Sequence, residues 1–104
     1  MLKKRTGLKT VKEYIRAIAA LNVKIERAIV FGSFSKNQLT EDSDIDVALI
    51  SDDFTDYPLA DCRKIAKANI RFPIIEPHTF SKKYFEKGDP FINEIKKTGI
   101  EVRI

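Results

Sequence analysis

A chain of 104 residues, of which 43% are hydrophobic and 33% charged, is expected to form one soluble globular domain over residues 1–104. Its apolar stretches are far shorter than the ~20 residues of a membrane span, and no apolar signal core follows the basic residues 1–5. The single cysteine, Cys62, excludes an internal disulfide, so these features together predict a cytoplasmic protein. The net charge of +4 is compatible with a nucleotide or nucleic-acid partner but requires neither.

The first predicted element is a helix that begins at a capping box over residues 10–13, Thr-Val-Lys-Glu. Behind this box, apolar side chains recur at helical spacing and would share one face of the helix: Val11, Tyr14, Ile15, Ile18 and Ala19. We expect the helix to end near Asn22.

Two nearly continuous apolar runs then predict strands over residues 27–31 and 45–50. Such runs are typical of central strands that are covered on both faces. Residues 34–43 between them are polar, and we expect one helical turn near residues 33–36. This connection is too long for a tight hairpin and short for a crossover that contains a helix. If the two strands are antiparallel neighbours, Gly32-Ser33 after the first and Asp44-x-Asp46 at the second meet at one edge of the sheet. We expect this topology because it brings those residues together.

An acidic loop over residues 51–56 precedes a second predicted helix, which runs from Pro58 to about Arg71. Pro58 suits a first helical turn, and Pro73 marks the end of the helix. Its spacing predicts an inward face made of Leu59, Cys62, Ile65, Ala66 and Ile70. A short third strand is expected over residues 74–76, where Pro77 would limit it.

The C-terminal part predicts a helix with Asp89 as N-cap and Pro90 as its first residue. Phe91, Ile92 and Ile95 would face the core, and Gly99 would follow the last turn. Residues 100–104 alternate and predict a closing strand. The whole pattern indicates an α/β (α+β) domain with a small mixed, partly antiparallel sheet flanked by helices.

The residues with the clearest chemical meaning lie where the two apolar strands would meet. Gly32 and Ser33 follow the first strand, and their backbone N–H groups and hydroxyl suit phosphate oxygens. Asp44 and Asp46 open the second strand at a spacing that puts both on one face. At about 5 Å and an effective dielectric near 20 they would repel by roughly 3 kcal/mol, which a divalent cation would offset. Oxygen ligands favour Mg²⁺ or Mn²⁺.

This pattern of Gly-Ser, ten residues and Asp-x-Asp resembles the signature of the DNA polymerase beta-like nucleotidyltransferase superfamily. Within it, the chain is most similar to the minimal nucleotidyltransferases. The resemblance implies that Gly32 and Ser33 hold the triphosphate, and that Asp44 and Asp46 hold the metal. It also implies a third carboxylate on a neighbouring strand, for which Glu76 is the candidate, although the superfamily usually has Asp there.

The resemblance further implies a Mg²⁺-dependent nucleotidyltransferase that moves a nucleoside monophosphate from ATP to an acceptor hydroxyl. Minimal nucleotidyltransferases pair with HEPN-type helical toxins, so the acceptor would be such a partner and the chain an antitoxin. A single small core leaves little surface for an acceptor, which also favours a hetero- or homo-oligomer. Two alternatives remain open: an antitoxin that acts by contact alone, and a small-molecule enzyme of the aminoglycoside-modifying kind.

Three further features of the sequence receive no role in the predicted site. His78 is the single histidine and has no ligand set near it in the sequence, so it is interpreted as a surface or loop residue. It could meet a phosphate or base if the third strand borders the site. Cys62 is interpreted as a small core residue. The lysines are spread over several segments, so we do not expect a nucleic-acid-binding stripe.

Overall fold

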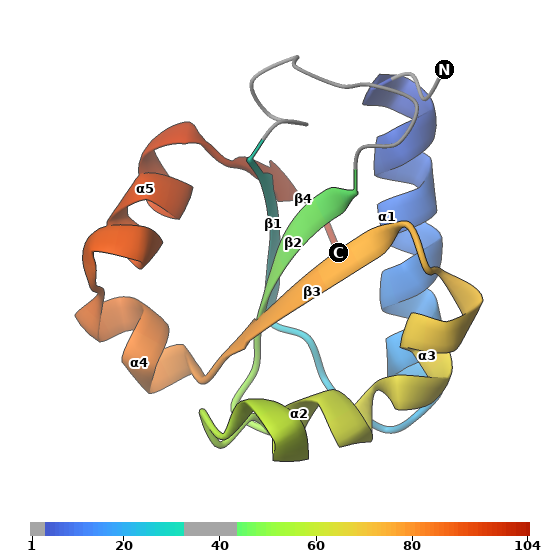
Figure 1. Cartoon of the computed structure of the whole chain (residues 1–104), viewed down its shortest axis with the longest axis horizontal. Coiled ribbons are helices and arrows are strands. Elements are labelled where there is room, and N and C mark those ends of the chain that lie inside the picture. Colours follow the sequence, from blue (N-terminus) through green and yellow to red (C-terminus); the bar gives the residue numbers. More distant parts are fainter. Residues whose placement is uncertain (1–3, 33–43) are drawn as a thin grey trace.

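The computed structural model describes residues 4–32 and 44–104, which form a four-stranded sheet with helices on both faces (Figure 1). Its strands lie in the order β3-β2-β1-β4. β1 is antiparallel to both β2 and β4, whereas β3 is parallel to β2. The elements in chain order are α1 (Lys4–Ala19), β1 (Arg27–Phe31), β2 (Ile45–Ile50), α2 (Pro58–Lys64), α3 (Ala66–Arg71), β3 (Ile75–Phe80), α4 (Lys82–Lys87), α5 (Pro90–Thr98) and β4 (Ile100–Val102).

Each face of the sheet has its own apolar core, because alternate residues of a strand point to opposite sides. In Figure 1, α1 and α3 lie on one side of the sheet and α4 and α5 on the other. The core under α1 and α3 includes Ala28, Val30, Ile45, Val47 and Leu49 from the two central strands. The core under α4 and α5 contains Ile29, Phe31, Ala48, Ile50, Phe80, Phe85, Ile92 and Ile95. Both central strands are therefore buried on both faces of the sheet, as their apolar runs predicted.

The two central strands begin and end at the predicted residues, and their antiparallel pairing is confirmed. Phe31 at the end of β1 lies opposite Asp46 near the start of β2. This register places Gly32, just after β1, next to Asp46 near the start of β2, so both lie where these two central strands meet at one end of the sheet. The helical turn expected near residues 33–36 and the polar connection over 34–43 lie outside the described residues.

The first helix begins earlier than predicted, since α1 starts at Lys4 and Thr10 lies inside it. The Thr10 hydroxyl donates a hydrogen bond to the Thr6 carbonyl oxygen at 3.0 Å, so it bonds back along the helix instead of capping an end. Ala19, predicted on the apolar face, is exposed, and Ala17 is buried instead. Hydrogen-bonded turns continue to Asn22, where φ is 64°.

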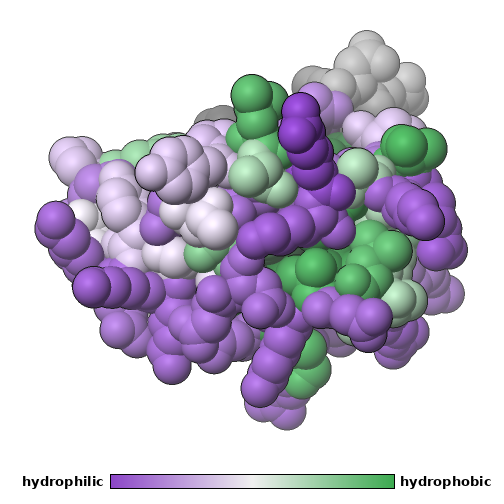
Figure 2. Space-filling model, turned by 90° about the horizontal axis from the view of Figure 1, so that it is seen from below, coloured by the Kyte–Doolittle hydropathy of each residue, from purple (hydrophilic) through white to green (hydrophobic). Residues whose placement is uncertain are grey.

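The predicted helix over residues 58–71 is divided into α2 and α3 by a break at Ile65. Leu59 and Ile70 are 80% and 79% exposed, so their predicted inward orientation was wrong, as was that of Ala66. Cys62 is partly buried and its thiol is free. In Figure 2, which views the molecule from the side of α2, hydrophobic atoms lie exposed among hydrophilic ones.

Ile65 is buried as predicted, and the other fully buried residues of this segment are Asp61 and Ala68. The Asp61 carboxylate accepts hydrogen bonds from the Thr55 N–H at 2.9 Å, the Thr55 hydroxyl at 3.0 Å and the Asp56 N–H at 2.9 Å. A buried carboxylate needs such donors, and here it fixes the loop that precedes α2. The apolar periodicity misled the prediction because a charged residue takes a core position.

The third strand is longer than predicted, because β3 passes through Pro77 and continues to Phe80. Among the described residues β3 pairs only with β2, so it is an edge strand of the sheet. Proline occurs on edge strands because its missing N–H need not serve a second neighbour there. The helix α4 was not predicted. Its N-cap is Ser81, whose hydroxyl oxygen accepts a hydrogen bond from the Tyr84 N–H at 3.1 Å.

The last helix, α5, has the predicted start, since the Asp89 carboxylate accepts a hydrogen bond from the Ile92 N–H at 2.7 Å and Pro90 is the first residue. Ile92 and Ile95 are buried, but Phe91 is 47% exposed. Gly99 ends the helix with a φ of −74°, and the closing strand is shorter than the predicted 100–104. Across the described residues, every helix is too short or too polar to span a membrane.

Candidate functional site

The candidate site lies on the α4 and α5 face of the sheet, where three polar side chains replace the apolar core. The parallel register of β2 and β3 places Glu76 beside Asp46 and His78 beside Ala48. Residues two apart on a strand share a face. Asp46, Glu76 and His78 therefore all point to the side that holds Phe31 and Phe80.

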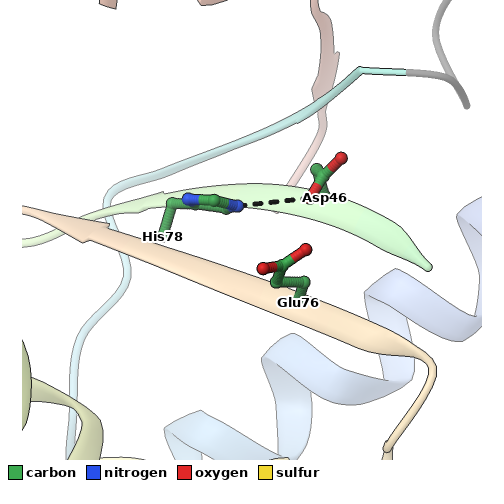
Figure 3. Close-up of side chains that lie close together, drawn as sticks. All are labelled: Asp46, Glu76 and His78. Atoms are coloured by element: carbon green, nitrogen blue, oxygen red, sulfur yellow. Dashed lines mark hydrogen bonds and ion pairs between the residues drawn. The ribbon is translucent and has the colours of Figure 1, made fainter. Parts of the chain in front are cut away.

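These three side chains converge on one another (Figure 3). One potential ligand atom from each lies within 4.8 Å of the other two. His78 Nε2 lies 3.2 Å from Asp46 Oδ1, within hydrogen-bonding distance. Two carboxylates and an imidazole are groups that bind divalent cations in proteins, so the donor set fits a metal ion.

Gly32 sits directly against this cluster. Its φ is +72°, in the left-handed region that favours glycine. A Cβ atom at this position would lie 2.5 Å from Asp46 Oδ2. Asp46 is thus partly buried, with one carboxylate oxygen towards His78 and the other towards the turn at Gly32. The sequence needs glycine here both for the backbone and for the carboxylate.

The proximity of the two carboxylates changes the protonation of Glu76. A hydrogen bond with Asp46 is the main cause that raises the pKa of Glu76 above its ordinary value. The negative charges of Asp46 and Asp44 add to this shift, whereas His78 opposes it. The repulsion between the Asp46 and Glu76 carboxylates is relieved when a positive charge lies between them. A proton supplies this charge at low pH, and a cation can supply it at neutral pH.

Aromatic rings surround the imidazole and limit its movement. The ring centroid of His78 lies 5.0 Å from that of Phe31 and 5.8 Å from that of Phe91. Phe31 and Phe91 also contact each other at 5.5 Å between centroids. This explains why Phe91 was wrongly predicted as a core residue: it packs against the edge of the site and stays half exposed.

The structure brings most of the predicted site residues to one place. Asp46 and Glu76 lie together, and Gly32 is adjacent to Asp46. Asp44 is exposed and lies outside the three-residue cluster, although its charge reaches Glu76. Ser33 lies outside the described residues.

His78 is the member of the cluster that the sequence interpretation missed. It was interpreted as a surface or loop residue, but it lies on β3 and is partly buried. The signal was available, because Glu76 and His78 repeat the i, i+2 spacing of Asp44 and Asp46. It was overlooked because Pro77 was expected to end the strand.

Comparison with known sequences identifies the family. The family profile described as "Polymerase beta, Nucleotidyltransferase" matches residues 13–102. The chain belongs to this family. It is accordingly a nucleotidyltransferase, a class of enzyme that uses a nucleoside triphosphate and generally a divalent metal. The predicted superfamily resemblance is confirmed.

Two curated relatives come from Methanocaldococcus jannaschii. The nucleotidyltransferase is 34% identical over 58 residues to "Putative protein adenylyltransferase MJ0604", an alignment that covers 55% of this chain and 58% of that protein. It is 29% identical over 98 residues to "Putative protein adenylyltransferase MJ0141", which covers 91% of this chain and 97% of that protein. The first alignment thus spans little more than half of its relative, and the second nearly all.

A solved structure supports the fold. The crystal structure of "a putative nucleotidyltransferase from Sulfolobus solfataricus" superposes with a TM-score of 0.67 and 15% sequence identity. The match covers 94% of this chain and 80% of that one. At this identity the likeness concerns the fold, and it confirms the predicted small mixed sheet of the polymerase beta-like type.

Proposed function

We propose that this nucleotidyltransferase moves AMP from ATP to a hydroxyl group of a protein, and that the acceptor is a HEPN-type helical toxin which it inactivates. The observation that carries the catalytic part is the convergence of Asp46, Glu76 and His78 beside the Gly32 turn. The name shared by the two archaeal relatives supports AMP as the transferred group and a protein as the acceptor. The partner and the antitoxin role rest on the resemblance to minimal nucleotidyltransferases.

The proposed division of roles follows from the positions of the side chains. Asp46 and Glu76, together with Asp44 at the start of β2, would hold a divalent cation, with Mg²⁺ or Mn²⁺ as candidates. When bound, such a cation neutralises the charge of the phosphates and of the leaving group. The turn at Gly32 and Ser33 would hold the triphosphate through backbone N–H groups and the hydroxyl.

The reaction would form one bond and break another at the α-phosphorus of ATP. The acceptor hydroxyl oxygen bonds to this phosphorus, while the bond to the bridging oxygen of the β-phosphate breaks and pyrophosphate leaves. The hydroxyl proton passes to a carboxylate, for which Glu76 is the candidate because it lies beside Asp46 and is exposed to an approaching acceptor. The products are the AMP-modified protein and pyrophosphate.

The catalytic proposal is tested with radiolabelled ATP, the purified partner and Mg²⁺ or Mn²⁺. The variant Asp46→Asn should abolish the transfer of label, since it removes a charge from the centre of the cluster. Asp52→Asn is a matched control, because Asp52 is an exposed carboxylate beyond the opposite end of β2. Transfer of label by Asp46→Asn at the rate of the wild type would refute the assignment of the site.

The partner is tested separately by co-expression with the neighbouring gene, followed by size-exclusion chromatography with light scattering. A stable complex should bury at least ~1,000 Å² in total. If the two proteins elute apart at micromolar concentration and neither receives AMP, the toxin–antitoxin assignment fails. A complex that forms and neutralises the toxin without transfer would instead support action by contact.

A further inference from the structure

We propose that His78 is a direct ligand of the bound cation, so that this site selects first-row transition metals such as Mn²⁺, Co²⁺ and Zn²⁺ over Mg²⁺. The inference rests on the proposed function only in taking the Asp46 and Glu76 cluster as the metal site. It adds a nitrogen ligand to a set that the sequence predicted to consist of oxygen atoms. An imidazole ligand is common for transition metals, whereas Mg²⁺ prefers oxygen.

The spacing of the ligand atoms supports direct coordination. With metal–ligand bonds of about 2.1 Å, two ligands at right angles lie about 3.0 Å apart and two opposite ligands about 4.2 Å apart. His78 Nε2 and Asp46 Oδ1 are 3.2 Å apart, close to the first value. All three ligand atoms lie within 4.8 Å of one another, and Glu76 is exposed and can adjust.

The imidazole is also held in place before any ion arrives. The Phe31 and Phe91 rings pack beside it, and its side chain is only 27% exposed. The parallel register of β3 with β2 fixes the backbone of His78 next to Ala48. A ligand that is already oriented loses little side-chain freedom when it binds, which favours coordination.

The competing interpretation is that His78 Nε2–H only donates a hydrogen bond to Asp46 and orients its carboxylate. Both interpretations predict weaker metal binding when His78 is replaced. They differ in whether the nitrogen touches the metal. This contact can be measured directly, because His78 is the single histidine of the chain.

The decisive experiment is pulsed electron paramagnetic resonance of untagged protein loaded with Mn²⁺. Direct coordination should produce the ¹⁴N modulation of a bound imidazole in the wild type, and His78→Gln should abolish it. Calorimetry should show that His78→Gln lowers Co²⁺ affinity by about tenfold or more, as expected for a lost or misoriented ligand, while Mg²⁺ affinity changes far less. Thr79→Val, which alters the neighbouring residue on the opposite face of β3, should leave both affinities unchanged.

Bound Mn²⁺ without ¹⁴N modulation in the wild type would overturn the inference, and this result does not depend on the folding of any variant. Equal losses of Co²⁺ and Mg²⁺ affinity in His78→Gln would also overturn it. The outcome is separable from the proposed function. AMP transfer with no ¹⁴N signal would refute only the nitrogen ligand, whereas a ¹⁴N signal with no transfer to any protein would refute only the function.

Discussion

Replacing Gly32 by alanine should separate the stability of the fold from the geometry of the site. The left-handed φ of +72° costs a non-glycine residue about 1–2 kcal/mol. For a domain of this size, that loss should lower the melting temperature by roughly 4–16 °C. The new Cβ would also lie 2.5 Å from Asp46 Oδ2, so the carboxylate must rotate away. We therefore expect Gly32→Ala to remain folded but to bind Mn²⁺ at least tenfold more weakly.

Gly88→Ala is the matched control for this prediction. Gly88 has a similar φ of +80°, but a Cβ there would lie 3.0 Å from the side-chain oxygen of Asn93, which is exposed and can turn aside. Both variants should show similar losses in urea denaturation, and only Gly32→Ala should lose Mn²⁺ affinity in calorimetry. Wild-type Mn²⁺ affinity in Gly32→Ala would refute the reasoning that glycine is needed to place Asp46.

Three other variants test separate parts of the structure. The raised pKa of Glu76 stabilises the apo protein below the ordinary value of 4.5, and this contribution is lost as pH rises through the raised pKa. The stability of Glu76→Gln relative to the wild type should therefore increase as the pH is raised from acid to neutral. A constant difference between the urea midpoints of the two proteins at all pH values would contradict this. Asp61→Asn should lower stability by about 1.5–3 kcal/mol, the value of hydrogen bonds to a buried charge, whereas the exposed Asp52→Asn should not; equal midpoints would show that Asp61 does not hold the loop. Ser33→Ala, which rests on the family resemblance, should weaken binding of a non-hydrolysable ATP analogue by roughly ten- to a hundredfold in calorimetry; unchanged affinity would make Ser33 an ordinary turn residue.

The sequence predicts the centre of this fold better than its periphery. β1 and β2 were predicted with the correct bounds because strands buried on both faces form nearly continuous apolar runs. The antiparallel pairing was expected because it brings the Gly32 turn and Asp46 together, and the register of the two strands confirms it. The strand bounds thus needed only the local pattern, whereas the pairing also needed the chemistry of these residues.

The errors arose where tertiary contacts override the local pattern. Asp61 occupies a core position because the loop before α2 supplies its hydrogen-bond donors, and this turned Leu59 and Ile70 outward. Pro77 was expected to end a strand, but it lies on an edge where a missing donor is tolerated. The same misjudgement hid His78, since a residue beyond the end of a strand has no predictable face.

The outer strands of the sheet also restrict how this protein can associate. A partner that extends a sheet needs a continuous row of backbone donors and acceptors on an edge strand. In the described part of the chain, one edge strand is β3, whose row of backbone donors lacks an N–H at Pro77. The other edge strand is β4, which has only three residues. Neither is a good template for a further strand. Association, including the proposed binding of a helical partner, should therefore occur through side chains on helices and loops, and growth into fibres by addition of strands should be disfavoured.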